Sequence, residues 1–430
     1  MKILWVTPKP TFPCEDGARR ATKNLLGAVT KAGASVYLIS MQSVIETRCE
    51  INFPEKNSFN EKFHCQGLGV ATTQFINYKR MNTKSFPSLV KAVGQSFLPP
   101  FLPATVAPFA CQKVKQQLMH LTQNKSWDCV VWDGAHAAAS LWEKSQMKVP
   151  PHFGKSIYRS NNVESDLWRT SRDATNNPLR QALLFQQEVL MRHFERKLIE
   201  NSVLTATVSK EDHKRFLDLS FGTGETITHT PIGFDFPLLS KVAENKEKHK
   251  AKTSQQLRLL FVGKLDWIPN CDGLKWFLKN VWPRVVSGRE NVILRIVGSG
   301  DASWLQPLFV DQAKIEFLGR VDDLDAVYAS TDVALVPIFI GSGARVKAIE
   351  AVVAGCCIVG TRHGVESAGL HAREHYLAAE SPDEWIDTIV NLSLTETENV
   401  ASRAFAHLRA TYDASLVAKQ FLAQIEKCLF

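Results

Sequence analysis

The sequence predicts an α/β fold with two Rossmann-like domains that face a central cleft. The chain has 430 residues, which is too long for a single domain of roughly 100–200 residues. Both halves alternate short apolar runs with helix-like segments, the pattern of parallel sheets covered by helices. A polar and heavily charged stretch, 241–256, separates the halves and cannot contribute much to a core. Together these observations indicate two doubly wound domains joined by a linker.

Five apolar runs in the second half predict one parallel sheet. They are short and mostly unalternating, as expected for strands buried on both faces: 257–262, 292–297, 314–318, 333–336 and 356–360. Helices between them are expected to begin at Asn270, at Asp322 and after the glycine turn 341–343. This order of elements gives right-handed βαβ units.

The first half repeats the pattern less regularly. Its predicted strands are 2–6, 35–40, 128–132, 156–159 and 203–208, and a long helical insertion covers about 176–200. We therefore divide the chain into a first domain, a linker, a second domain and a last helix that is expected to pack back on the first domain: 1–240, 241–256, 257–412 and 413–430. Ligands of such sheets bind beyond the carboxyl ends of the strands, here in the expected cleft.

The composition is that of an ordinary globular protein, with 45% hydrophobic and 22% charged residues. No stretch approaches the roughly 20 apolar residues of a membrane span, and MKILWVTPKP is typical of a strand followed by prolines, so we expect a cytoplasmic protein without a signal peptide. The nine cysteines show no zinc-ligand spacing, so we expect no structural metal.

A net charge of +8 favours anionic partners. The sequence has no basic run interleaved with aromatic residues, so we expect no nucleic-acid partner.

The segment after Pro337 predicts a phosphate-binding helix start. A buried strand ends there, a glycine-rich turn follows at 341–343, and a helix opens directly after it. Backbone N–H groups at such a helix start bind anions such as a diphosphate. Arg345 and Lys347 add positive charge, and Glu350 can accept hydrogen bonds from a ribose diol. The alternative is an ordinary glycine turn with a Lys347–Glu350 surface pair.

A second segment, 261–277, points to the same site. Its strand ends at Gly263 and delivers Lys264 to the same edge of the sheet, where an ammonium group would neutralise a departing phosphate. A solvated lysine after a strand is the simpler alternative.

Four ordered motifs resemble a known family: VGKLDWIPNCDGLKWF, IVGSG, FLGRVDDLDAVYASTDVALVPI and GSGARVKAIEAVVAG followed by GVESAGL. They look like the donor half of glycosyltransferase family 4, which has the GT-B fold, and especially its branch with G-x-(M/L)-D-W-x-P-N-x-D-G. In the first half SNNVESDLW, TVSKEDHKRF and TPIGFDF are similar to stretches of the same branch. The resemblance covers nearly the whole chain.

The resemblance implies a retaining, metal-independent glycosyltransferase. Such an enzyme moves a sugar from a UDP or GDP sugar to a glycan, a lipid-linked acceptor or another hydroxyl group, here expected in bacterial cell-surface polysaccharide synthesis. The nucleotide sugar is a substrate, so no cofactor is expected. The departing phosphate is expected to accept the proton of the acceptor.

The resemblance also implies roles for individual residues. Glu350 would hold the donor ribose, and Lys264 takes the place of a phosphate-binding Arg. Arg320 and Val321 would receive the base, and Gly17 matches a glycine loop beside donor and acceptor. The remaining donor contacts would come from the strand end and the turn: Gly263, Gly341, Ser342, Gly343, Ala344 and Arg345.

Three positions depart from the family pattern. Ser342 stands where the family has a first Glu, and Asn270 stands where it commonly has a phosphate-binding Lys, so that Arg345 or Lys347 has to supply that charge. The family's sugar-contacting His falls near Asp133, while the nearest histidine is His136. Either could contact sugar or acceptor; otherwise they are a turn residue and a helix-start histidine.

The acid pattern Asp323-Leu324-Asp325 is not expected to bind metal, because it lies in the first turn of a predicted helix.

Two rival functions remain. A sugar-nucleotide epimerase of the same fold would need paired carboxylates, which Ser342 disfavours. A non-catalytic nucleotide-sugar-binding subunit is disfavoured by the presence of Lys264 and Glu350.

Residues 79–119 combine several basic residues with the apolar, proline-interrupted run SFLPPFLPATVAPFA. One hypothesis is peripheral contact with an anionic membrane that carries a lipid-linked acceptor. The other is that the run fills the core of the first domain. The two make opposite predictions for Phe97, Leu98, Phe101 and Leu102.

Overall fold

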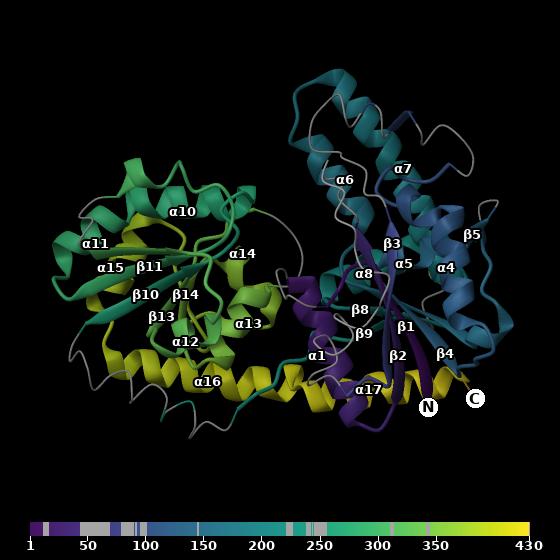
Figure 1. The fold of residues 1–430 in the computed structure, drawn as a ribbon. Helices are drawn as coiled ribbons and strands as arrows, with labels where there is room; N and C mark the ends of the chain where they lie inside the picture. The colour runs from purple at the N-terminus through teal and green to yellow at the C-terminus, as the bar shows by residue number, and fades with distance from the viewer. Residues whose placement is uncertain are drawn as a thin grey trace, which may run out of the picture. The chain divides into compact units, whose positions relative to one another are not determined.

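The computed structural model describes residues 1–11, 17–43, 69–78, 101–143, 146–220, 227–237, 256–309, 314–340 and 345–429, with isolated positions at 90, 93, 94, 242 and 244. It divides into two compact units, Met1–Gly233 with Ala414–Phe430, and Phe234–Asp413 (Figure 1). The division falls at Gly233, earlier than the predicted end of the first domain at 240. Most of the predicted linker 241–256 lies outside the described residues.

The first unit is built on a parallel sheet of seven strands in the order β3-β2-β1-β4-β7-β8-β9 (Figure 1). The strands are β1 Lys2–Thr7, β2 Ser35–Ser43, β3 Thr72–Tyr78, β4 Cys129–Asp133, β7 Lys155–Ser160, β8 Leu204–Thr207 and β9 Ile227–His229. The five predicted strands are all present. The sequence analysis missed the two edge strands, because β3 is rich in polar residues and β9 has only three residues.

Helices cover both faces of this sheet. Alternate residues of β1 point to opposite faces: Ile3 and Trp5 pack against α1 (Gly17–Lys31) and α17 (Ala414–Leu429), where the Trp5 and Phe421 rings lie 6.1 Å apart. Leu4 and Val6 face the opposite core, which α4 (Gln112–Thr122) and α7 (Pro178–Glu200) cover. The last helix thus lies in the first unit.

The remaining elements of the first unit are short connections. They are α5 Ala135–Ala138, α6 Glu164–Asp173, α8 Lys210–Leu219 and a two-stranded hairpin of β5 Trp142–Glu143 and β6 Gln146–Met147. The predicted helical insertion at 176–200 corresponds to α7, which α6 precedes.

The second unit has a parallel sheet of six strands in the order β12-β11-β10-β13-β14-β15. They are β10 Leu257–Val262, β11 Val292–Val297, β12 Ile315–Gly319, β13 Val333–Val336, β14 Cys357–Gly360 and β15 Leu377–Ala378. Only β15, with two residues, was not predicted. The direction of chain progression reverses between β10 and β13, which makes their carboxyl ends the switch point where ligands bind in such sheets.

Helices of the second unit are α10 Ile268–Asn280, α11 Trp282–Gly288, α12 Leu324–Ala329, α13 Val346–Val353, α14 Arg362–Val365, α15 Pro382–Asn391 and α16 Leu394–Tyr412. Two predicted caps are wrong by one or more residues. Asp323, not Asp322, caps α12 by accepting a hydrogen bond from the Ala326 N–H. Helix α10 already begins at Ile268, so Asn270 lies in its first turn. Its side chain does not cap the helix and is hydrogen-bonded to Lys264 and Lys347 instead.

Helix α10 packs very closely against the end of β13. A Cβ atom at Gly273 would lie 1.7 Å from the carbonyl oxygen of Pro337, so only glycine fits there. This contact fixes α10 at the switch point of the second sheet.

The apolar, proline-interrupted run of the first half contains both a buried and an exposed residue. Leu102 is 3% exposed and belongs to the core, together with Val106 and Phe109. Phe101 is 52% exposed, and Phe97 and Leu98 lie outside the described residues. Among the described residues, no helix combines the length and hydropathy needed to cross a membrane.

This difference between neighbours gives a stability prediction. Leu102→Ser is expected to lower the free energy of unfolding by about 3 kcal/mol, because it opens a cavity and buries a hydroxyl group. Phe101→Ser should change it by less than about 0.5 kcal/mol. Urea unfolding of both variants measures the difference. Flotation with anionic vesicles then isolates the membrane hypothesis: if wild type floats and Phe101→Ser does not, Phe101 contacts lipid.

Candidate functional site

The second unit gathers polar side chains at the carboxyl ends of β10 and β13. Lys264 follows β10 and remains largely exposed, and its Nζ lies 3.6 Å from an Asp266 carboxylate oxygen. An exposed ammonium beside one exposed carboxylate is free to move toward an anionic ligand, since surface pairs of this kind stabilise by less than about 1 kcal/mol.

Asn270 connects Lys264 with Lys347. Its side chain is buried; its Nδ2 donates to the Lys264 carbonyl oxygen at 3.0 Å, and its Oδ1 accepts from Lys347 Nζ at 2.6 Å. Gly263 makes room for this amide, because a Cβ atom at 263 would lie 2.5 Å from Asn270 Nδ2. The amine of Lys347 therefore lies beside the side chain of residue 270, the residue at which the resemblance described above implies a lysine.

The surroundings of Lys347 disfavour its charge. Its Nζ lies over the buried Phe261 ring, 5.3 Å from the ring centre, a contact that by itself favours the charged amine. Burial, with the positive charge of Arg345 adding to it, lowers the pKa of Lys347 to about 7, while Glu350 opposes this shift. With a pKa of about 7, the amine of Lys347 is about half protonated at pH 7, and an anion that binds beside it favours the protonated form.

Arg345 immediately precedes α13 and is buried. Its Nη2 lies 3.1 Å from His363 Nε2, and its Nε donates to the His363 carbonyl oxygen at 3.4 Å. Burial lowers the pKa of Arg345, although an arginine stays charged at neutral pH. The predicted turn residues Gly341, Ser342, Gly343 and Ala344 lie outside the described residues.

The other residues predicted to bind the sugar donor belong to the same unit. Glu350 is half-buried on α13, three residues after Lys347, so both side chains share one face of the helix. Arg320 is exposed and Val321 half-buried directly after β12. Because β12 is separated from β10 by β11, these two lie farther along the sheet edge than Lys264 does.

The first unit has a cavity of about 410 Å³ at its own switch point, where β1 and β4 end. Its lining includes Lys9, Arg19, Tyr78, Phe109, His136 and Asn161. Gly17 is the first residue of α1, whose first turns supply Arg19 and Thr22 to the cavity wall; the preceding residues 12–16 lie outside the described part of the chain.

Asp133 is a completely engaged carboxylate. One oxygen accepts from Trp5 Nε1 at 3.1 Å and Thr22 Oγ1 at 2.6 Å, and the other accepts from Arg159 at 2.6 Å and Asn161 at 3.0 Å. The residue is 0% exposed. These four bonds join β1, α1, β4 and the end of β7, so Asp133 holds the cavity wall in place.

His136 lies on the lining of the same cavity, in the short helix α5. Its ring centre is 5.4 Å from that of Phe109, which orients the imidazole. Asp133 and His136 were the two candidates for a contact with sugar or acceptor. His136 is the more accessible of the two, whereas both carboxylate oxygens of Asp133 are engaged in hydrogen bonds within the protein.

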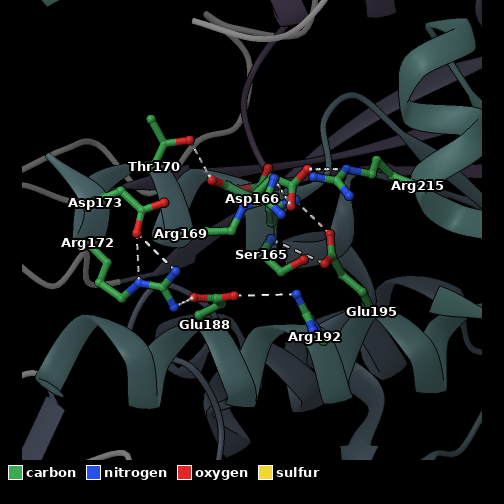
Figure 2. Close-up of polar contacts among 11 residues, drawn as sticks. Ser165, Asp166, Arg169, Thr170, Arg172, Asp173, Glu188, Arg192, Glu195 and Arg215 are labelled. Carbon is green, nitrogen blue, oxygen red and sulfur yellow. Dashed lines mark hydrogen bonds and ion pairs between the residues drawn. The ribbon is translucent and has the colours of Figure 1, made fainter. Parts of the chain in front are cut away.

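Helix α7 holds helix α6, which borders this cavity, in place. Glu195 of α7 reaches the start of α6, where its oxygens accept from the N–H groups of Glu164 at 2.6 Å and Ser165 at 3.2 Å. Figure 2 shows the contact of Glu195 with Ser165. Glu195 is fully buried, and burial raises its pKa to about 8 against the effect of these bonds. Ion pairs of Asp166 with Arg169 and Arg215 add to the attachment. Glu164, which lines the cavity, is thereby held in position.

The sequence analysis did not single out several residues that complete these sites: Asp266, His363, Arg159, Asn161 and Glu195. Three of them carry a usable signal: Asp266 and Asn161 follow closely on predicted strands, and Arg159 ends the predicted strand 156–159, at carboxyl ends that were expected to bind ligand. His363 and Glu195 lie on helices, and only the folded chain brings them to their partners.

Comparison with known proteins agrees with this architecture. The chain superposes on the crystal structure of Anabaena Alr3699/HepE in complex with UDP and glucose with a TM-score of 0.61 and 13% identity, over 99% of both chains. WaaG, a glycosyltransferase involved in lipopolysaccharide biosynthesis, gives a TM-score of 0.58 and 15% identity, again over 99% of both chains. The fold is the GT-B fold. The predicted fold class is thus confirmed, while the cleft between the two domains stays a prediction.

Two sequence matches concern parts of this GT-B chain. Residues 256–394 match the family model described as Glycosyl transferases group 1, a segment within the second unit that contains Lys264, Asn270, Lys347 and Glu350. The "Uncharacterized 44.6 kDa protein in cps region" of Klebsiella pneumoniae is 26% identical over 168 residues, which are 37% of this chain and 43% of the relative. The chain therefore matches less than half the length of that relative.

Proposed function

We propose that this protein is a retaining glycosyltransferase that transfers a sugar from a UDP or GDP sugar to a hydroxyl acceptor without a metal. The observation that carries the proposal is the group formed by Lys264, Asn270 and Lys347 at the switch point of the second sheet. Two lysines at the carboxyl end of a parallel sheet, beside the start of α13, suit a diphosphate. The match of residues 256–394 to Glycosyl transferases group 1 supports this choice.

The proposed roles follow from position. Lys264 stabilises the negative charge that develops on the leaving phosphate. Lys347 binds the diphosphate, and Asn270 orients its amine through a hydrogen bond. Glu350 accepts hydrogen bonds from the ribose, and Arg345 holds the start of α13 through His363. Arg320 and Val321 lie near the base. The turn Gly341–Ala344 supplies backbone contacts to sugar and phosphate.

The cavity of the first unit is the proposed acceptor site, with His136 as the side chain that contacts the sugar or acceptor. Asp133 lines this cavity, and Gly17 begins helix α1, which supplies Arg19 and Thr22 to its wall. In this proposal the departing phosphate accepts the acceptor's proton, so no protein nucleophile is needed. A glycan or a lipid-linked acceptor on the cytoplasmic face of a membrane suits the proposal. The relative in a cps region supports a role in cell-surface polysaccharide synthesis.

A thermal-shift panel tests the proposal at its first step. UDP, GDP, ADP and their sugars are compared, and one nucleotide diphosphate is expected to raise Tm, since a ligand at a hundred times its Kd stabilises by about 2.7 kcal/mol. The Asn270→Ala variant should lose most of this shift. A panel in which no nucleotide raises Tm would refute the proposal.

The pKa of Lys347 predicts that nucleotide binding depends on pH. At about 7, the amine is largely uncharged above neutral pH in the free protein. A diphosphate favours the charged amine, so binding at about pH 8 is expected to take up a proton, and affinity should fall as pH rises. Isothermal titration of UDP in two buffers with different ionisation enthalpies measures this uptake. Lys347→Met should abolish it, and Lys279→Met, on the surface of α10, should not. Equal enthalpies in both buffers for wild type would contradict the assignment.

The same pKa predicts the direction of a stability change. The pKa of Lys347 is lower in the folded chain than its ordinary value of 10.5, so the unfolded chain holds more protons between about pH 7 and 10.5. Lys347 therefore makes the free energy of unfolding rise with pH across this range. The Lys347→Met variant should lack this contribution.

A further inference from the structure

Three histidines of the second unit, which the proposed function does not use, lie together: His371 is exposed, His375 is buried and His407 is half-buried. Their candidate ligand nitrogens all lie within 4.8 Å of one another. We propose that these histidines bind a divalent transition-metal ion, best matched by Zn²⁺, that ties the turn at 371–376 to helix α16. Imidazole nitrogens are preferred ligands of zinc and nickel.

A tight turn brings the first two histidines to one side. Ala372 and Tyr376 form an isolated β-bridge, and the Arg373 N–H donates to the Tyr376 carbonyl oxygen at 2.9 Å. Arg373 has φ of 68°, the left-handed conformation that reverses the chain. The rings of His371 and His375 consequently lie 5.4 Å apart.

Helix α16 supplies the third histidine. Arg403 Nε donates to the Glu374 carbonyl oxygen at 2.8 Å, which fixes the turn against the helix. His407 follows four residues later on the same helix face. Its ring stacks on that of His375, with centres 4.1 Å apart, and lies 5.4 Å from that of His371.

The hydrogen bond of His407 leaves one of its ring nitrogens available to an ion. His407 Nε2 lies 2.8 Å from the Gly369 carbonyl oxygen, which can only accept, so the proton is on Nε2 and the Nδ1 lone pair is left for an ion. A carbonyl acceptor on the second nitrogen is the usual support of a metal-binding histidine.

Binding requires a modest rearrangement. Nitrogens around a tetrahedral zinc lie about 3.4 Å apart, given Zn–N bonds of about 2.1 Å, so the set must contract from its present spread. Two features of the present arrangement prevent binding. The stacked rings of His375 and His407 direct their lone pairs parallel to each other, and His375 Nδ1 accepts a hydrogen bond from the backbone N–H of His371 at 3.2 Å. For an ion to bind, the His375 ring therefore has to turn about its Cβ–Cγ bond and the exposed His371 side chain has to move toward it. The exposed Glu374 carboxylate, 3.6 Å from His375 Nε2, is placed to supply a fourth ligand.

Titration of the full chain with Zn²⁺ and, separately, Ni²⁺ tests the proposal. We expect one ion per chain by calorimetry and a rise in Tm. His371→Ala and His407→Ala should each weaken binding by roughly tenfold or more, whereas His120→Ala, an exposed histidine of the first unit, should not. Wild type that binds no ion would overturn the proposal. So would binding that both variants retain, since the ion would then lie on other groups such as cysteines. Circular dichroism shows that each variant is folded, and the assay does not depend on enzymatic activity.

Discussion

Replacing Lys264 by alanine is expected to lower kcat about a hundredfold while changing the donor KM by less than about threefold. The reason is that its ammonium is exposed and weakly paired with Asp266, so that its largest interaction arises when negative charge develops on the leaving phosphate. Initial rates of nucleotide release at several donor concentrations measure both constants.

Two variants control this experiment. Lys279→Ala removes an exposed lysine from the surface of α10 and should leave both constants unchanged. Lys264→Arg should retain most of the rate, because the family resemblance has an arginine at this position. An effect of Lys264→Ala on KM alone would show that Lys264 only binds the donor.

Glu350→Ala is expected to weaken nucleotide binding about a hundredfold, since two hydrogen bonds from a ribose to a charged group contribute about 3 kcal/mol or more. The Tm should change little, because Glu350 is half-buried on one face of α13. Calorimetry with UDP and a melting curve are recorded on the same sample. Asp272→Ala, an exposed acid on α10, is the matched control.

One indirect effect has to be separated from the ribose contact. Glu350 raises the pKa of Lys347, so removing it also makes Lys347 less charged. In the Lys347→Met background residue 347 is uncharged with or without Glu350, and the affinity loss caused by Glu350→Ala should persist there. A loss that disappears in this background, or a loss of stability with unchanged affinity, would show that Glu350 does not contact the ribose.

The sheets could be predicted from the sequence because their strands are buried on both faces. Unalternating apolar runs such as 257–262 have few alternatives to a parallel strand. The edge strands β3 and β9 failed this criterion, since an edge strand buries less and needs less apolar sequence. The cap at Asp323 was missed by one residue because Asp322 and Asp323 offer the same chemistry.

The site was predictable as far as it follows strand ends and family motifs. Lys264 and Lys347 were identified in this way, but their connection through Asn270 was not, because it joins residues 77 positions apart. Asp133 illustrates the opposite limit: its position after the predicted strand 128–132 suggested a ligand contact, while the four groups that donate hydrogen bonds to it come from other segments. The histidine group was missed because His407 is far along the chain from the HAREH segment.

The most direct test of the central claim is turnover of the donor without metal. Nucleotide release from UDP and GDP sugars is followed with a panel of hydroxyl acceptors, in the presence and absence of a chelator, and the anomeric configuration of the product is determined by NMR. We predict that one donor is turned over at equal rates with and without chelator, and that the product retains the anomeric configuration. An inverted product, a rate abolished by chelator, or tight donor binding without any turnover would contradict the account.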